Sequence, residues 1–292
     1  TSLAEAKVIA RGIDNTCGDI RTNSGADKIS AIATSYSATY AEAQVSALTT
    51  APPENQALAL VVVEAIAKTE DIAIAIDNYY GDIRTGSGAD TIEATANASD
   101  NAIGIYNKYG YIGLGVGKDR IEVTANASEN AIGIYNKYGH IHTGDGADTI
   151  KASANTNGNG TAIFNHQGDI RTGYGADTIE AYATGSQSYG IYGGNIITGY
   201  GADTVKASSF GGGVKINMGY GIDYVEGFGE ATVYGGADFD TLSLGSYNRS
   251  DFNIHTINDF TIFELGGTIM ETNGFEKYTF ADGDYSSHNL IA

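Results

Sequence analysis

The stretch DIRTGSGADTIEA, residues 82–94, contains one complete unit of the pattern that the chain repeats. A short strand-like segment leads into a Gly-x-Gly turn, and an aspartate then precedes a second strand-like segment. Gly86 and Gly88 allow positive φ, so the backbone carbonyls of such a turn can point toward one position. Asp90 adds a carboxylate at that position. Oxygen ligands of this kind suit a hard cation.

The same turn recurs along most of the chain. The motif aspartates Asp90, Asp119, Asp148 and Asp177 follow one another at a constant interval, which shortens progressively toward Asp240. A period of roughly 20 to 50 residues predicts stacked supersecondary units. The other turns read NSGAD at 23–27, GVGKD at 115–119, GDGAD at 144–148, GYGAD at 173–177 and 199–203, GYGID at 219–223 and GGADFD at 235–240.

Each full period contains three segments in which apolar residues alternate with polar or small ones. This alternation predicts strands buried on one face, with Ile92, Ala94 and Ala96 inward in the first and Ile103 and Ile105 inward in the second. Three strands and three corners per period predict an all-β fold, a right-handed parallel β-solenoid with coils of about 29 residues. The three segments are TIEATA (91–96), AIGIYN (102–107) and YIGLG (111–115).

Both ends of the repeat depart from this period. From Asp203 the coils shorten toward about 18 residues by loss of the middle strand, and irregular strands follow Asp240. We therefore predict a solenoid over residues 1–242 and a C-terminal β cap over 243–292. The interval from Asp27 to Asp90 is two periods plus about five residues. We expect a degenerate coil between them, with a loop near 49–62 in place of the glycine turn. A helix over 41–48 is a second interpretation.

Two further columns accompany the glycine turns. The asparagines predict side-chain hydrogen bonds along the solenoid axis, as in the ladders of stacked β structures. The tyrosines predict an aromatic stack, or alternatively a flat surface for sugars. The asparagines are Asn15, Asn78, Asn107, Asn136 and Asn165, and the tyrosines are Tyr79, Tyr80, Tyr106, Tyr109, Tyr135 and Tyr138.

The composition excludes several classes of partner. The 292 residues include 40 glycines and carry a formal net charge of −19, which would repel nucleic acid and anionic membranes. No run of about 18 apolar residues is present, so no membrane span is expected. The one cysteine, Cys17, cannot form an intramolecular disulfide. It could pair between chains, or it could be a small residue packed beside a turn.

The repeated turns resemble the RTX or haemolysin-type calcium-binding repeat G-G-x-G-x-D-x-U-x, in which U is a large apolar residue. The resemblance is carried by GGADFDTLSL (235–244) and by TGxGADTI in several coils, and it covers most of residues 18–242. The segment FEKYTFADGDY (275–285) is also similar to the strand that follows the last repeat in such proteins. The resemblance implies a parallel β-roll in which about six Ca²⁺ ions lie between turns of successive coils.

Carried onto this sequence, the resemblance implies carboxylate and carbonyl ligands in each turn. Thr85 stands where the motif has its first glycine, as does a threonine in several other turns, and Asn23 replaces a glycine of the first turn. The implied carboxylates are Asp27, Asp90, Asp119, Asp148, Asp177, Asp203, Asp223 and Asp240, with Asp238 added from the last turn. The implied carbonyls are those of Gly86, Gly88, Gly144, Gly146, Gly173, Gly175, Gly199, Gly201, Gly219 and Gly221.

These features predict a secreted or cell-surface structural protein that calcium stabilises. We expect no enzyme activity, because HExxH and GxSxG motifs are absent from the sequence. His140 and His142 would share one strand face and could bind a transition metal, but surface histidines are the simpler interpretation. The alternatives are a non-catalytic glycan- or surface-binding module and the RTX portion of a larger secreted enzyme. Cell-surface, matrix or glycan partners and end-to-end self-assembly are further expectations.

Overall fold

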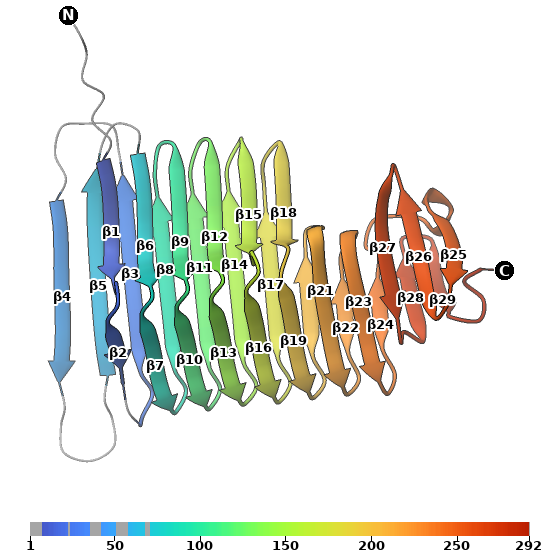
Figure 1. Ribbon diagram of the computed structural model, residues 1–292, viewed down its shortest axis with the longest axis horizontal. Helices are drawn as coiled ribbons and strands as arrows, with labels where there is room; N and C mark the ends of the chain where they lie inside the picture. The colour runs from blue at the N-terminus through green and yellow to red at the C-terminus, as the bar shows by residue number, and fades with distance from the viewer. Residues whose placement is uncertain (1–7, 23, 36–41, 51–57, 68–70, 292) are drawn as a thin grey trace, which may run out of the picture.

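The computed structural model describes residues 8–22, 24–35, 42–50, 58–67 and 71–291. Parallel strands stack side by side along an elongated solenoid, from β1 (Val8–Asp14) near one end to β29 (Gly283–Ser286) near the other (Figure 1). The described residues form a 17-stranded sheet, a 12-stranded sheet and one short 3₁₀ helix, η1 (Arg249–Asp251). No helix of the described part is long and apolar enough to cross a membrane. The predicted all-β parallel solenoid is confirmed.

Each full coil contributes three strands, as the sequence predicts. In the coil of the quoted stretch, β6 (Asp71–Tyr79) and β7 (Asp82–Ser87) belong to the larger sheet, and β8 (Thr91–Asn97) belongs to the smaller one. Tyr80, with φ 53°, forms the corner between β6 and β7. The next coils contain β9 (Asn101–Lys108), β10 (Tyr111–Val116) and β11 (Arg120–Asn126); β12 (Asn130–Lys137), β13 (His140–Asp145) and β14 (Thr149–Asn155); β15 (Asn159–Phe164), β16 (Asp169–Tyr174) and β17 (Thr178–Ala183); and β18 (Gln187–Tyr192), β19 (Asn195–Tyr200) and β20 (Thr204–Ala207).

The core is a set of apolar columns that run along the solenoid axis. Ile83 pairs with Ile112 of the next coil, which pairs in turn with Ile141, and all three are at most 1% exposed. This register is maintained because a slip of one residue would turn every buried side chain toward solvent. The predicted inward positions in β8, namely Ile92, Ala94 and Ala96, are confirmed as buried.

The prediction for β9 is correct for Ile105 and wrong for Ile103. Ile105 is fully buried, whereas Ile103 is only half-buried. Ala102 and Gly104 are the buried residues on either side of it, and a Cβ added to Gly104 would overlap Val123 of the facing sheet. The alternation breaks between Gly104 and Ile105, which are both buried, so a strict period of two places Ile103 on the wrong face.

The first coil stacks directly on the coil of β6, β7 and β8, which differs from the expected degenerate coil between them. Strands β1 (Val8–Asp14), β2 (Asp19–Arg21) and β3 (Lys28–Ser35) pair in parallel with β6, β7 and β8. The intervening chain instead forms β4 (Glu42–Thr50) and β5 (Leu58–Ala67), an antiparallel pair in which β5 also pairs with β3. An insertion at a corner of the solenoid therefore adds strands at its end without interrupting the stack.

This arrangement bears on two expectations for the N-terminal region. The alternative helix over 41–48 is wrong, because residues 42–50 form β4. The loop predicted near 49–62 is wrong for residues 49–50 and 58–62, which belong to β4 and β5. Residues 51–57 lie outside the described residues, as does Asn23.

The coils narrow near the C-terminal end, as predicted. Strand β21 (Phe210–Tyr220) pairs with both β18 and β19, so it replaces the two strands that a full coil contributes to the larger sheet. The last coils consist of β22 (Tyr224–Glu226), β23 (Gly229–Ala237) and β24 (Thr241–Ser243). At this end of the solenoid the pairing becomes antiparallel. Strands β25 (Asn253–Ile257), β26 (Phe260–Leu265) and β27 (Thr268–Asn273) form one antiparallel set, and β28 (Lys277–Phe280) pairs with β29 (Gly283–Ser286). Strands β27 and β28 pair with β23 and β24, so they cover the edges of the last coil.

The predicted asparagine ladder is present along the corner between β6 and β7 and its equivalents. Asn78 Nδ2 donates to Asn107 Oδ1 at 2.7 Å, and Asn107 Nδ2 donates to Asn136 Oδ1 at 2.8 Å. Asn15 and Asn165 extend the ladder at its two ends. The ladder satisfies buried amides from coil to coil, which is a structural role.

Candidate metal-binding column

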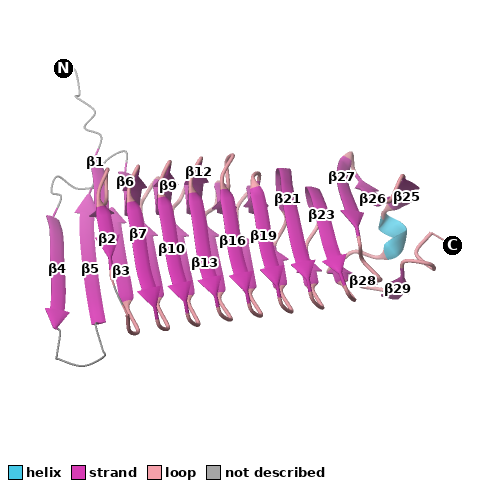
Figure 2. Cartoon of the chain, turned by 60° about the horizontal axis from the view of Figure 1, so that its bottom comes forward, coloured by secondary structure: helices cyan, strands magenta, loops and turns pink. Residues whose placement is uncertain are grey.

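The glycine–aspartate turns all connect the larger sheet to the smaller one and lie along one edge of the solenoid (Figure 2). Each turn follows a strand of the β7 column and precedes a strand of the β8 column. Because the strands on both sides pair in register, equivalent turn residues of successive coils lie directly above one another. The sequence motif therefore becomes a set of residue columns parallel to the solenoid axis.

The turn glycines are required by backbone geometry whether or not a metal is bound. Gly146 has φ 151°, and a Cβ added to it would overlap the carbonyl oxygen of Gly117 in the preceding coil. Such φ values are accessible to glycine and strained for other residues. The candidate glycines Gly86, Gly88, Gly144, Gly146, Gly173, Gly175, Gly199, Gly201, Gly219 and Gly221 all have φ between 101° and 151°.

The motif aspartates form one continuous buried column. The backbone N–H of Asp90 donates to Oδ1 of Asp119 at 2.8 Å, and the N–H of Asp119 donates to Oδ1 of Asp148 at the same distance. The same bond links each aspartate to the next, at 2.8–2.9 Å. The column contains Asp27, Asp90, Asp119, Asp148, Asp177, Asp203, Asp223 and Asp240, each at most 1% exposed.

One oxygen of every carboxylate in this column lacks a partner. Within the part of the chain that the structure describes, Oδ2 of each aspartate from Asp27 to Asp240 is buried and accepts no hydrogen bond. The hydroxyls of Thr143 and Thr172 lie close enough to lower the pKa of Asp148 and of Asp177. They do not satisfy Oδ2, because Thr143 Oγ1 donates to the carbonyl of Thr172 and Thr172 Oγ1 donates to that of Thr198. A buried, unpartnered carboxylate oxygen is costly. The column therefore repeats an unsatisfied acceptor once per coil.

Burial raises the pKa of these aspartates. Desolvation raises the pKa of Asp119 to about 7, and the neighbouring carboxylates of Asp148 and Asp90 add to the rise. Desolvation also raises the pKa values of Asp90 and Asp148. It raises the pKa of Asp177, Asp203, Asp223 and Asp240 to about 6 in each case. A hydrogen bond from the adjacent backbone amide lowers each pKa, and a nearby threonine side chain also lowers those of Asp90, Asp148, Asp177 and Asp203, but together they offset only part of the effect.

The two ends of the column differ. The N–H of Asp240 donates to Oε2 of Glu276 at 2.8 Å, so a glutamate of the C-terminal cap continues the ladder. At the other end, Asp27 has no hydrogen-bond partner on either carboxylate oxygen among the described residues. Asp238 lies outside the column, because it is exposed with φ 85° where the preceding turn has Gly221. The sequence does not predict Glu276 as a member of the column. The only signal that the sequence offers for this residue is its place directly before β28.

The donor set consists of oxygen atoms in single file. The described residues contain no cluster of three or more His, Cys, Asp or Glu side chains that could hold a metal. Each gap between coils is instead bordered by two aspartates, so the remaining ligands of a bound ion would be backbone carbonyls or water. A carboxylate and carbonyl set of this kind fits Ca²⁺, which tolerates irregular geometry.

The two histidines do not gather further ligands. His140 Nδ1 lies 3.6 Å from Asp169 Oδ2, and the His140 side chain is 62% exposed. His142 lies on the same strand, β13. The arrangement is a pair of surface histidines beside one carboxylate.

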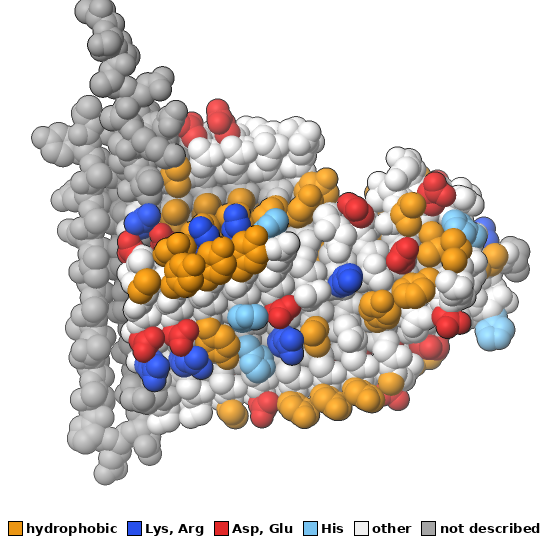
Figure 3. Space-filling view, in the orientation of Figure 1, with side chains coloured by type: hydrophobic (Ala, Val, Ile, Leu, Met, Phe, Trp, Pro, Cys, Tyr) orange, Lys and Arg blue, Asp and Glu red, His pale blue; other side chains and the backbone are white. Residues whose placement is uncertain are grey.

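Of the six tyrosines predicted to stack, Tyr80, Tyr109 and Tyr138 form an aromatic stack. The others make edge-on ring contacts, Tyr79 with Tyr80 and Tyr106 with Tyr135. The rings of Tyr80 and Tyr109 are 4.8 Å apart and those of Tyr109 and Tyr138 are 5.1 Å apart, nearly parallel in both cases. Tyr174, Tyr200 and Tyr220 form a second stack on the glycine-turn edge. Rows of hydrophobic side chains run along the solenoid on the face in Figure 3. Because stacked rings cover one another's faces, these tyrosines present mainly edges and hydroxyls to solvent.

The fold and the column together define a parallel β-solenoid with a buried file of carboxylates. Neither the models of known protein families nor the curated protein sequences match this chain. The case for its function therefore depends on the geometry of the column and on the resemblance of its turns to the RTX repeat.

Proposed function

We propose that this chain is a calcium-binding solenoid in which a file of Ca²⁺ ions neutralises the aspartate column and stabilises the fold. The observation that carries the proposal is the buried, unpartnered Oδ2 atom on each motif aspartate. Near neutral pH, carboxylates with pKa values of about 6 to 7 are half or more ionised. Stacked like charges about 4.8 Å apart then require a cation between them.

Calcium suits the column better than magnesium does. Mg²⁺ demands nearly octahedral geometry and retains its water, whereas Ca²⁺ accepts six to eight oxygen ligands in flexible arrangements. The eight turns from Asp27 to Asp240 enclose seven gaps, because Asp27 stacks directly on Asp90, so we expect about seven ions rather than the six that the sequence alone suggests. Binding of about seven Ca²⁺ would change the formal charge of −19 to about −5.

A secreted or cell-surface structural role follows from this design. Extracellular calcium-binding modules have dissociation constants of about 0.1 to 1 mM, which suits the high calcium concentration outside the cell. An elongated solenoid with regular faces is suited to contacts with other surface or matrix molecules rather than to catalysis. The proposal therefore includes no enzymatic activity.

Calorimetric titration of the chelator-treated protein with Ca²⁺, together with thermal unfolding followed by circular dichroism, tests the proposal. We expect about seven bound ions and a higher melting temperature, because binding free energy adds to folding free energy. Mg²⁺ at the same concentration is the control and should raise the melting temperature less. Absence of binding heat, combined with identical melting curves in calcium and in chelator, would refute the proposal.

A further inference from the structure

The narrowing of the solenoid opens a groove beside the C-terminal cap. Strand β21 pairs with β18 only at Ile191 and Tyr192, so the earlier part of β18 has no strand beyond it. The order β18–β21–β23–β27 places β18 and β27 three strand spacings apart, or about 14 Å. The cavity between them has a volume of about 640 Å³. This volume is within the range of small-molecule and cofactor sites.

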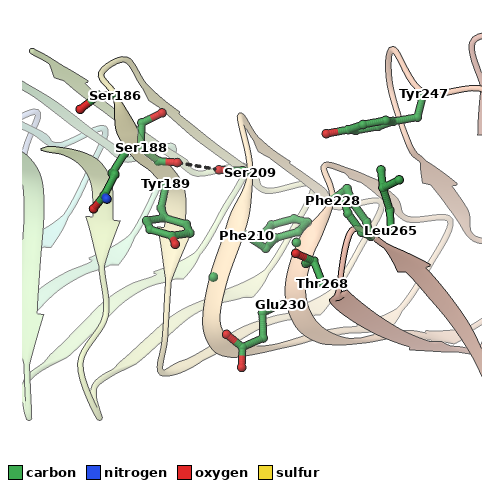
Figure 4. A pocket seen from close by; sticks show the side chains of 13 residues that line it. Ser186, Ser188, Tyr189, Ser209, Phe210, Phe228, Glu230, Tyr247, Leu265 and Thr268 are labelled. Carbon is green, nitrogen blue, oxygen red and sulfur yellow. Dashed lines mark hydrogen bonds between the residues drawn. The ribbon is translucent and has the colours of Figure 1, made fainter. Parts of the chain in front are cut away.

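Aromatic rings form the floor and two sides of this groove. Figure 4 shows Tyr189 and Tyr247 on opposite sides, with the rings of Phe210 and Phe228 between them. The Tyr189 ring lies against Gly211, where an added Cβ would overlap it, so the glycine supports one part of the ring. Tyr189 is 38% exposed and Tyr247 is 37% exposed. The ring of Tyr189 packs edge-on against the ring of Tyr192. The stacked tyrosines, in contrast, cover one another's faces.

Four polar side chains of the groove are free to bind a ligand, whereas Ser186 and Ser209 donate to backbone carbonyls. The side chains of Gln187, Ser188, Glu230 and Thr268 line it. None of the four forms a side-chain hydrogen bond to another described residue. Uncharged amide and hydroxyl groups next to exposed aromatic rings form a surface that matches the hydroxyls and the apolar C–H faces of a sugar ring.

The charge of the groove and the hydrogen bonding of its wall narrow the choice of ligand. Glu230 is the only charged side chain among the lining residues, so an anionic ligand would be repelled. Addition of a peptide strand to β18 is also disfavoured, because the Ser188 carbonyl already accepts a hydrogen bond from Ser209 Oγ at 3.1 Å. A neutral ligand with many hydroxyl groups fits both conditions.

We propose that the groove between β18 and β27 binds a neutral saccharide chain. Sugar rings stack on Tyr189 and Tyr247, and their hydroxyls form hydrogen bonds with Gln187, Ser188 and Glu230. This site lies away from the aspartate column and does not depend on the calcium proposal.

The test is an NMR titration of the full chain with neutral linear oligosaccharides of glucose, mannose and xylose, carried out in excess calcium. We expect saturable shifts at Tyr189 and Tyr247 for at least one of these probes. Tyr189→Ala should weaken binding about tenfold, as expected for the loss of one aromatic contact. Tyr109→Ala is the matched control, because Tyr109 is 42% exposed but belongs to the stacked column. This variant should bind like the unmodified chain.

Charge provides a second arm of the experiment. An oligogalacturonate should bind more weakly than the neutral probes, and Glu230→Gln should reduce that difference, because the only charge in the groove is removed. The proposal is overturned if no neutral probe saturates the protein up to about 10 mM. It is also overturned if binding survives Tyr189→Ala and is lost in Tyr109→Ala. Tighter binding of the oligogalacturonate or of an uncharged extended peptide than of every sugar would likewise overturn it.

Discussion

The backbone N–H of Asp119 donates to Oδ1 of Asp148 at 2.8 Å, while Oδ2 of Asp148 is buried without a partner. One oxygen therefore fixes the orientation of the carboxylate, and the other is left available beside the next coil. This division recurs at each motif aspartate from Asp90 to Asp240. It gives the column two opposite effects on stability, because the hydrogen bond stabilises the stack while the buried charge destabilises it.

Replacing Asp148 by asparagine separates these two effects. We expect Asp148→Asn to keep a side-chain acceptor for the Asp119 amide and to remove one buried charge. The calcium-free variant should therefore be more stable than the unmodified chain, and the calcium-loaded variant less stable, by about 1–3 kcal/mol in each case. Thermal unfolding in chelator and in calcium measures both shifts.

Asp145→Asn is the matched control, since Asp145 is exposed in the same turn. It removes the same formal charge without touching the column, so both melting temperatures should change little. If Asp148→Asn shifts stability in the same direction in chelator and in calcium, the column does not bind calcium in the manner proposed.

The pH dependence of the calcium-free protein follows from the raised pKa values. Asp119 has a pKa of about 7 and Asp177 of about 6 in the folded protein, against about 3.9 in an unfolded chain. Between pH of about 4 and 7 the folded state thus binds more protons than the unfolded state. The free energy of unfolding in chelator should therefore fall as the pH rises through this window.

Calcium should reverse that trend, because protons compete with the ion for the same carboxylates. Urea unfolding at a series of pH values, with and without calcium, measures both slopes. Asp177→Asn should flatten the slope in chelator more than the control Asp145→Asn does. A calcium-free stability that increases from pH 4 to pH 7 would contradict the assignment.

The sequence predicts the columns because the constant interval between motif aspartates places Asp119 above Asp90 in a parallel register. It does not predict the first coil correctly, because the interval from Asp27 to Asp90 is close to two periods, whereas in the structure β3 pairs directly with β8 and the intervening β4 and β5 form an antiparallel pair instead of a coil. Glu276 was also missed. It reaches Asp240 through the pairing of β28 with β24, which lies outside the repeat.

The turn glycines offer a test of close stacking that does not involve metal. Gly146→Ala combines a φ of 151° with overlap on the Gly117 carbonyl, so we expect a loss of more than about 3 kcal/mol. Gly245→Ala is the control, since Gly245 has φ 62° and no atom within 4 Å of an added Cβ. It should lose only about 1–2 kcal/mol. Equal losses in chemical unfolding would show that the turns are not closely stacked.

The asparagine ladder should contribute to stability in proportion to its burial. Asn136 is fully buried, accepts from Asn107 and donates to Asn165, both at 2.8 Å. Asn136→Ala removes the side-chain donor to Asn165 Oδ1, whereas Asn107 Nδ2 keeps the carbonyls of Gly110 and His140 at 3.3 Å. The buried oxygen left unpaired should cost about 1–3 kcal/mol. Asn155→Ala is the control, because Asn155 belongs to an exposed ladder and donates to Asn126 at 2.8 Å, so its removal should cost less than about 0.5 kcal/mol. Urea unfolding of both variants in calcium gives the comparison. If the two variants lose the same free energy of unfolding, the buried ladder contributes no more to the stability of the stack than the exposed ladder does. The corner at Tyr138 would then be stabilised by the core packing of the coils and not by the ladder.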